Sequence, residues 1–356
     1  MPESGAQPTV LSMHSGCDLA KGGGKRKIKN PAVRNGPKEE KRAAENEKSE
    51  NLVDMNKIIA LLGEKLPQMK VREDVLLSSC TSFRTGGPAD AAANPGNSKE
   101  LGELLALCKQ EGVPCYILGN GTNVLAPDEG FRGIVILTSE MRKIDVDEKT
   151  GIAEAGAGAL FSALSLECAK KNLTGLEYAR GIPGSVGGAV VMNAGAYGGE
   201  VKDSLISVTV MGEDGGKPFK MNADELELGY RHSVIPERRL VVLDAKFKLK
   251  SGDHDSIYGL MDELSARRRE KQPLEYPSAG STFKRPEGYF AGKLIEDAGL
   301  KGFGIGGAQV SEKHAGFVIN SGGATSEDIE NLIKEVQRQV FENSGVRLET
   351  EVRFMR

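Results

Sequence analysis

The stretch GIPGSVGGAVVMNAGAYGG, residues 181–199, says more about the fold than any other part of the sequence. It contains seven glycines. Because glycine has no Cβ, such a stretch lets a flat ligand lie directly against the backbone. A sharp turn followed by a closely packed helix would use glycine in the same way. Taken alone, this stretch leaves both interpretations open.

Two further glycine segments favour the ligand interpretation. GNGTNVL, residues 119–125, follows a predicted buried strand at 114–118, and SFRTGG occupies residues 82–87. The first is not a dinucleotide-binding G-x-G-x-x-G motif, because it lacks the third glycine and is followed by a strand at 133–137 instead of a helix. No P-loop sequence occurs either. Backbone N–H groups in such turns bind anions, so the three segments together favour a phosphate-bearing cofactor held mainly by the main chain.

Hydrophobic periodicity around these segments predicts a mixed α/β chain of the α+β class, with several antiparallel strands. Ser98 is the predicted N-cap of a helix that ends before Gly112. An alternating strand at 346–354 closes the chain. Helices are predicted at 55–66, 99–111, 159–170, 255–271 and between 325 and 345, and further strands at 205–210 and 240–248.

Length and composition exclude several classes of protein. The chain has 356 residues, enough for about two domains. Its 47 Lys and Arg residues against 50 Asp and Glu leave a net charge of −3, which offers no positive field to nucleic acid or to an anionic membrane. Aromatic residues make up only 5% and tryptophan is absent, which disfavours base stacking. No run of about 18 apolar residues occurs, so no membrane-spanning helix is predicted.

The five cysteines and four histidines form no C-x-x-C or H-x-x-x-H spacing. An odd number of widely spaced cysteines is typical of a reduced, cytoplasmic protein. We therefore predict cytoplasmic localisation and no metal site.

Residues 1–50 differ in composition from the rest of the chain. They hold ten basic and seven acidic residues and few large apolar ones, so we predict a disordered basic tail. The simplest interpretation of the tail is a solubilising extension or an over-long start. A nucleic-acid-binding or targeting segment is the alternative.

Seven motifs stand in order along the chain: SFRTGG (82–87), LGNGTNVL (118–125), GIPGSVGG (181–188), NAGAYG (193–198), YRHS (230–233), AGSTFK (279–284) and EVRF (351–354). This combination resembles the UDP-N-acetylenolpyruvoylglucosamine reductase (MurB) family of bacterial peptidoglycan synthesis. The resemblance covers about residues 52–356, and the combination is much more specific than any single motif. The interval from Lys250 to Ser281 is too short for the tyrosine-bearing insertion of one subgroup, so the chain resembles the shorter, second type.

The resemblance implies a vanillyl-alcohol-oxidase (PCMH-type) FAD-binding fold of two α+β subdomains, followed by a C-terminal α+β substrate-binding domain. Residues 51–250 would form the FAD-binding domain and residues 251–356 the substrate-binding domain, whose final strand returns Glu351 to the flavin site. The resemblance also implies non-covalent FAD, NADPH as hydride donor, and reduction of UDP-N-acetyl-3-O-(1-carboxyvinyl)-glucosamine to UDP-N-acetylmuramate. The expected partner is this small-molecule substrate, with no nucleic acid, membrane or obligate protein partner.

The family's functional residues carry over onto matching positions. Arg231, Ser281 and Glu351 match its catalytic residues. Residues expected to contact the substrate are Tyr197, Lys271, Gly280 and Arg285, the last of which stands where some members have asparagine. Residues expected to bind the cofactor lie in the three glycine segments and are Arg84, Thr85, Gly86, Gly119, Asn120, Gly121, Thr122, Asn123, Gly181, Ile182, Pro183, Gly184, Ser185, Gly187 and Gly188.

The three catalytic matches suit the chemistry of an enol ether that carries a carboxylate. Hydride addition to one carbon places negative charge on an enolate, which needs a cation or a hydrogen-bond donor and a proton donor for the adjacent carbon. Arg231 suits the first task because its planar guanidinium stays charged and can clamp a carboxylate. Ser281 is expected to donate the proton, and Glu351 to share a hydrogen bond or a proton with the enolate. Taken singly, each has a simpler interpretation: a surface arginine, a capping serine and an exposed strand carboxylate.

Two other functions stay open at this point. A flavoenzyme of the same fold with covalent flavin, acting on a sugar or alcohol, would need His or Cys beside a glycine motif, and segments 119–125 and 181–189 contain neither. A nucleotide-sugar-binding regulator without catalysis is the second alternative. The joint presence of Arg231, Ser281 and Glu351 counts against it.

Overall fold

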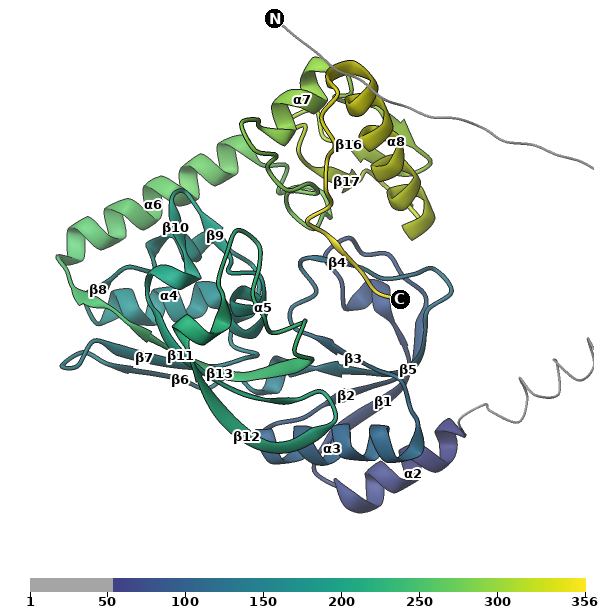
Figure 1. Ribbon diagram of the computed structural model, residues 1–356, viewed down its shortest axis with the longest axis vertical. Coiled ribbons are helices and arrows are strands. Elements are labelled where there is room, and N and C mark those ends of the chain that lie inside the picture. The colour runs from purple at the N-terminus through teal and green to yellow at the C-terminus, as the bar shows by residue number, and fades with distance from the viewer. Residues whose placement is uncertain (1–53) are drawn as a thin grey trace, which may run out of the picture. The chain divides into compact units, whose positions relative to one another are not determined.

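The computed structural model describes residues 54–356. The predicted tail, residues 1–50, lies outside this range. Helices and strands alternate irregularly along the described chain (Figure 1), which confirms the predicted α+β class. Three groups of elements follow one another, each around its own hydrophobic core.

The first group is a four-stranded sheet of order β1-β2-β5-β3 with two helices. Its members are α2 (Met55–Lys65), β1 (Lys70–Leu76), β2 (Pro88–Asn94), α3 (Ser98–Glu111), β3 (Cys115–Leu118) and β5 (Phe131–Leu137). Strand β2 is antiparallel to β1 and parallel to β5, and its alanines are fully buried on both faces. Leucines spaced three and four apart bury one face of α3, as the periodicity predicts.

The N-cap of α3 differs from the prediction. Asn97, not Ser98, precedes the first helical residue, and the Asn97 Oδ1 atom accepts a hydrogen bond from the Glu100 N–H (2.9 Å). A capping side chain must come from a residue with extended backbone, and Asn97 has φ −154° while Ser98 is already helical. At the other end Gly112 adopts φ 67° and closes the helix, as predicted.

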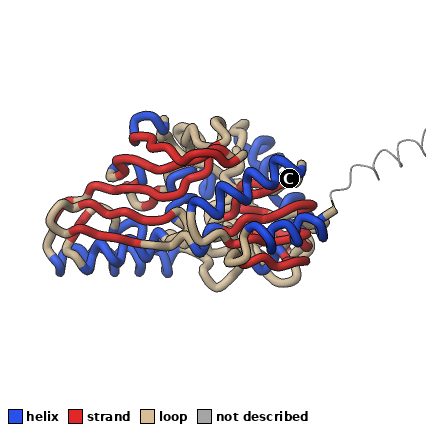
Figure 2. Tube along the Cα trace, turned by 90° about the horizontal axis from the view of Figure 1, so that it is seen from below, coloured by secondary structure: helices blue, strands red, loops and turns tan. Residues whose placement is uncertain are grey.

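The second group is a five-stranded antiparallel sheet of order β12-β11-β13-β7-β6. Its members are β6 (Ile144–Asp147), β7 (Ile152–Gly156), α4 (Phe161–Lys170), α5 (Val186–Val191), β11 (Leu205–Gly212), β12 (Gly215–Asn222) and β13 (Leu240–Lys248). Helices α4 and α5 share one hydrophobic core with the inward residues of β7, β11 and β13. Helices lie along the strands of the sheets in Figure 2.

The third group is smaller. It contains α7 (Ala291–Asp297), the three-stranded sheet β15 (Gly304–Ile305), β16 (Ala308–Val310) and β17 (Val318–Asn320), and α8 (Ser326–Ser344). The Thr325–Asp328 capping box and the left-handed Gly345 bound α8, as predicted. Five aliphatic side chains on one face of α8 are buried in the core of this group.

The sequence predicts one regular strand at 346–354, but the chain does not end in such a strand. Only β18 (Arg353–Phe354) is regular, and it pairs in parallel with β4 (Val124–Leu125), next to the first group. Before it, the backbone of 349–351 bonds to 282–284, and the chain changes partner to β4 only at β18, so no continuous ladder forms. Burial still alternates as expected, with Leu348 and Val352 buried. In Figure 1 this segment (yellow) runs from α8 back to β4.

Helix α6 (His254–Lys271) joins the second and third groups along the chain. Its Ile257 and Met261 side chains pack with Ala169 of α4. An Arg268 Nη1 donates to the carbonyl of Gly181 at the end of the 3₁₀ helix η3 (Glu177–Gly181). Helix α6 therefore packs on the second group, although it follows the predicted domain boundary at 250/251.

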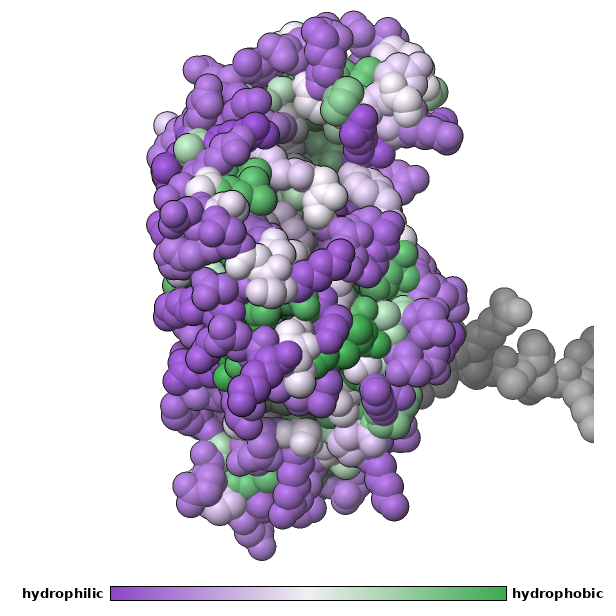
Figure 3. All heavy atoms as spheres, turned by 90° about the vertical axis from the view of Figure 1, so that its left-hand side faces the viewer, coloured by the Kyte–Doolittle hydropathy of each residue, from purple (hydrophilic) through white to green (hydrophobic). Residues whose placement is uncertain are grey.

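None of the helices within residues 54–356 is long and apolar enough to cross a membrane. On the face drawn in Figure 3, hydrophilic residues predominate and the hydrophobic ones show as small separate groups.

Candidate active site

A cavity of about 1530 Å³ lies among the three groups. Residues 119–123 and 181–185 line it, together with Gly187 and Gly188 at the start of α5. Arg231, Ser281 and Glu351 line the same cavity. The structure thus brings together two of the three glycine segments and all three predicted catalytic residues.

The two glycine segments pack closely against each other. The Asn120 side-chain amide donates to the Pro183 carbonyl (2.7 Å). A Cβ at Gly119 would clash with Ser185 Oγ, so a larger residue there would push the two segments apart. Gly121 needs its lack of a side chain for two reasons, since its φ is +62° and a Cβ would meet the Cys80 carbonyl.

Several backbone N–H groups of these cavity-lining segments have no acceptor within the described residues. Within residues 54–356, the backbone N–H groups of 120–123 and of Gly184 donate no hydrogen bond. Asn120 is exposed, but Gly121, Thr122, Asn123 and Gly184 are buried or half-buried, and N–H groups in such residues need an acceptor. A run of N–H groups without one suits an anion. The donor set therefore fits the pyrophosphate of a dinucleotide cofactor. Ser185 has another task, since its Oγ accepts from the Gly188 N–H (3.3 Å) and caps α5.

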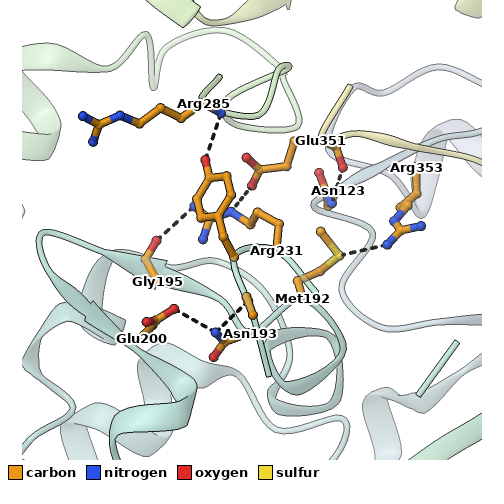
Figure 4. Close-up of polar contacts among 11 residues, drawn as sticks. Asn123, Met192, Asn193, Gly195, Glu200, Arg231, Arg285, Glu351 and Arg353 are labelled. Carbon is orange, nitrogen blue, oxygen red and sulfur yellow. Dashed lines mark hydrogen bonds and ion pairs between the residues drawn. The ribbon is translucent and has the colours of Figure 1, made fainter. Parts of the chain in front are cut away.

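Arg231 comes from a tight turn between η5 (Ala223–Leu226) and β13. The Gly229 and His232 backbones pair with each other, and Arg231 between them has φ 54°. Its Nε donates to Glu351 Oε1 (2.5 Å) and its Nη2 to the Gly195 carbonyl (3.2 Å). Figure 4 shows the Arg231 and Glu351 side chains pointing toward each other.

The backbone of Glu351 is hydrogen-bonded on both sides, to the loop before α7 and to the glycine segment at 119–123. Its N–H donates to the Thr282 carbonyl (2.8 Å), and its carbonyl accepts from the Asn123 side-chain amide (3.0 Å). The Arg231 and Glu351 side chains are only 19% and 14% exposed. Burial raises the pKa of the Glu351 carboxyl, an effect that outweighs the opposing charge of Arg231. The carboxyl therefore holds a proton more readily than an exposed glutamate does.

Ser281 follows a left-handed glycine, Gly280 (φ 77°), and precedes a buried anchor. That anchor is Thr282, which is fully buried, donates its N–H to the Gly316 carbonyl (2.8 Å) and accepts the Val318 N–H at its Oγ1 (2.9 Å). The Ser281 side chain is exposed and lines the cavity. A fixed backbone thus presents its hydroxyl to the cavity.

A second cavity of about 360 Å³ adjoins the first. Arg231, Ser281, Glu351 and His314 line both cavities. His314 Nδ1 accepts the Gly316 N–H (3.1 Å), and burial lowers the pKa of its imidazole. The neutral ring therefore carries its proton on Nε2. Reasoning from the sequence missed His314, because a single histidine in a loop gives no signal when only His and Cys clusters are sought.

The predicted substrate residues divide between the two cavities. Tyr197, Lys271 and Gly280 line the larger one, and Arg285 lines the smaller one. The Arg285 N–H donates to the Tyr230 hydroxyl (3.0 Å), and its guanidinium stacks 3.9 Å from the Phe290 ring centre.

Arg84, Thr85 and Gly86 line neither cavity. The Thr85 hydroxyl is hydrogen-bonded to that of Ser326 (2.8 Å) at the start of α8. Gly86 has φ 113°, and a Cβ there would approach Ala126 Cβ to 2.7 Å. Their visible contacts are with the protein, and a role in holding the cofactor stays a prediction for these three.

No group of three or more His, Cys, Asp and Glu side chains within residues 54–356 is arranged to hold a metal ion.

Comparisons with known proteins agree with this geometry. A family model described as "UDP-N-acetylenolpyruvoylglucosamine reductase, C-terminal domain" matches residues 272–355, and one described as "FAD binding domain" matches residues 89–217. The UDP-N-acetylenolpyruvoylglucosamine reductase of Agathobacter rectalis is 51% identical over 303 residues, which cover 82% of this chain and 96% of the relative. That of Clostridium novyi is 49% identical over 303 residues, with coverages of 85% and 97%.

A solved structure shows the same similarity. The UDP-N-acetylenolpyruvylglucosamine reductase (MurB) of Thermus caldophilus matches with a TM-score of 0.69 and 36% sequence identity. The match covers 81% of this chain and all of that one.

Proposed function

The chain belongs to the UDP-N-acetylenolpyruvoylglucosamine reductase (MurB) family, and on that premise we propose how its residues carry out the reduction. It is an FAD oxidoreductase with NADPH as reductant, and it acts on a UDP-sugar in peptidoglycan synthesis. The FAD-binding fold of the family carries the cofactor, and the third group of elements corresponds to the family's C-terminal domain.

The cofactor would lie in the larger cavity. The free N–H groups of 120–123 and Gly184 would hold its pyrophosphate, and the small residues at 181–188 let it approach the backbone. When bound, FAD supplies hydride, obtained from NADPH, to the enol ether. No His or Cys occurs in these two segments, so we propose that it is held without a covalent bond.

The Arg231–Glu351 pair beside Ser281 is the observation on which the proposed mechanism rests. Arg231 would bind the substrate carboxylate and stabilise the charge that develops on the enolate. Glu351, whose raised pKa favours the neutral carboxyl, would donate a hydrogen bond to the same charge. Ser281 would donate its Oγ proton to the carbon next to the one that receives hydride.

The domain boundaries and the cellular localisation are also proposals. We propose an FAD-binding domain at 51–250 and a substrate-binding domain at 251–356, with Glu351 returned to the first by the β18–β4 pairing. Cys80, Cys108, Cys115 and Cys168 are free thiols, which supports a reducing, cytoplasmic setting. The small-molecule substrate is the only partner that we propose.

The visible spectrum of the purified protein tests this function. We expect flavin absorbance that NADPH bleaches under anaerobic conditions and that UDP-N-acetylenolpyruvoylglucosamine then restores. A non-catalytic nucleotide-sugar binder would show no flavin even after incubation with FAD. A reduced flavin that oxygen reoxidises but the enol ether does not would favour another flavoenzyme of this fold.

A further inference from the structure

Asn193, two residues after the end of α5, has a fully buried side chain whose polar atoms are all paired. Its Nδ2 donates to Glu200 Oε2 (2.7 Å) and to the Gly229 carbonyl (2.9 Å). Its Oδ1 accepts the Lys202 N–H (2.9 Å). Asn193 itself adopts φ 39°, a left-handed conformation that asparagine tolerates better than most residues. Figure 4 shows its amide between Glu200 and the turn that carries Arg231.

The bond to Gly229 reaches the turn on which Arg231 stands. The Gly229 N–H donates to the His232 carbonyl (3.1 Å) and the His232 N–H to the Gly229 carbonyl (3.2 Å). Arg231, between them, has φ 54°, which costs a non-glycine residue free energy and persists only where the surroundings hold it. Asn193 supplies one such restraint, and Ser233, whose Oγ donates to the Val191 carbonyl (2.7 Å), supplies another.

Both restraints attach the turn to the same short helix. The first residues of α5, Gly187 and Gly188, line the larger cavity. Its last turn leads to Asn193, whose N–H donates to the Val190 carbonyl (3.0 Å). One short helix therefore connects the glycine segment to the Arg231 turn.

We propose that Asn193 is a positioning residue for the reduction, which holds the Arg231 turn in register with the cavity so that Arg231 meets Glu351. The proposal rests on the function proposed above, because it needs Arg231 to act on the substrate. Asn193 lines neither cavity and touches no reacting atom in this account.

Asn193→Gly is the variant that tests this. Glycine keeps the left-handed backbone free of strain while it removes the amide, so the turn loses its restraint without a new clash. Asn193→Asp is a second variant of the same shape, which keeps the acceptor for Lys202 but places oxygen against the Glu200 carboxylate and the Gly229 carbonyl. Asn320→Ala is the matched control: that buried amide also makes three bonds, to Phe83, Gly322 and Ala324, far along the chain from Arg231.

Two measurements on the FAD-loaded protein separate positioning from simple loss of stability. The first is stopped-flow absorbance, which follows flavin reduction by NADPH and then reoxidation by the enolpyruvyl substrate. In both Asn193 variants we expect reduction within about twofold of wild type and reoxidation slowed about 10²-fold, the usual cost of misplacing a reacting group by about 1 Å. Asn320→Ala should lower the melting temperature and leave the ratio of the two rates unchanged.

The second measurement is the titration of the Glu351 carboxyl, followed by ¹³C NMR with Glu351→Gln to assign the signal. The charges that face Glu351 are Arg231 and, more weakly, Lys284. Displacing Arg231 removes the larger lowering effect, so the pKa of Glu351 should rise in Asn193→Gly and stay unchanged in Asn320→Ala. An unchanged Glu351 pKa together with an unchanged reoxidation rate would overturn the proposal, as would equal slowing of both half-reactions.

A third variant, Arg231→Lys, distinguishes an incorrect role for Asn193 from an incorrect proposed function. If Arg231→Lys slows reoxidation and the Asn193 variants do not, Asn193 has no positioning role and the function stands. If Arg231→Lys itself reoxidises at the wild-type rate, the role proposed for Arg231 fails.

Discussion

The position of Ser281 is fixed by the backbone of the residues on either side of it, not by a hydrogen bond of its own side chain. Left-handed Gly280 precedes it and buried Thr282 follows it, so the backbone is fixed while the hydroxyl faces the cavity. If Ser281 donates the proton to carbon, it takes no part in flavin reduction. Ser281→Ala should therefore bind FAD and be reduced by NADPH at near the wild-type rate, with reoxidation by substrate slowed about 10²–10⁴-fold. Stopped-flow absorbance measures each rate, and equal slowing of both would make the serine structural.

Glu351 should give the second half-reaction a pH dependence of its own. Burial raises the pKa of its carboxyl, so the neutral form persists above the ordinary range of glutamate. If the neutral form donates to the enolate, reoxidation falls as pH rises through that raised pKa. Glutamine at 351 cannot ionise, so in Glu351→Gln the reoxidation rate should no longer decrease with pH. The rate of flavin reduction should show no such decrease in either protein.

A pH dependence that persists in Glu351→Gln would belong to another titratable group that lines the cavities, and His314 is a candidate because it lines both of them. The same raised pKa also affects stability. Since the folded state binds this proton more tightly than the unfolded chain does, the contribution of Glu351 to the free energy of unfolding decreases as pH rises above the ordinary carboxyl range.

Among the elements, the two-residue strand β18 fixes the position of the segment that carries Glu351. The Arg353 N–H donates to the Asn123 carbonyl (2.9 Å) and the Met355 N–H to the Leu125 carbonyl (3.0 Å). These bonds join the segment that carries Glu351 to the glycine segment that lines the cavity. Asn123 adds its side-chain bond to the Glu351 carbonyl.

Arg353→Pro tests this pairing, because proline has no N–H to donate to Asn123. We expect the free energy of unfolding to fall by about 1–3 kcal/mol, the cost of an unpaired acceptor, and the reoxidation rate to fall with it. Arg353→Ala is the control for stability, since it keeps the N–H. Its exposed side chain lies near Met192 Sδ and lines the larger cavity, so only the stabilities of the two variants are compared. Urea unfolding of the two variants should differ; equal stabilities would show that the pairing does not hold this segment.

At the scale of the whole molecule, the larger cavity must release its cofactor when the fold is lost, if no covalent bond holds it. The glycine segments contain no His or Cys, although Cys108, Cys115 and His314 line other parts of the cavity wall. Acid precipitation should therefore leave the flavin in the supernatant, where its absorbance is read. Colour that stays with the pellet would mean a covalent link, and Cys115→Ser and His314→Ala would then identify the attachment.

Much of this protein was predictable from local sequence. Helix periodicity, the Thr325–Asp328 capping box, the glycine that ends α3 and the main strands depend on residues close together in the chain, and the structure confirms them. The exchange of Ser98 for Asn97 as the N-cap is an error of one residue, because both side chains can cap and only the backbone conformation chooses between them.

Only the tertiary structure decided how Arg231, Ser281 and Glu351 meet. They come from a turn before β13, the loop between α6 and α7 and an irregular segment after α8, and no local pattern places these side by side. The sequence pattern also put Glu351 on a charged strand face, whereas long-range packing buries its carboxyl against Arg231 and raises its pKa. The backbone conformations of local elements follow from neighbouring residues, but burial and electrostatics depend on which distant segments pack around a group, and only the folded chain specifies that.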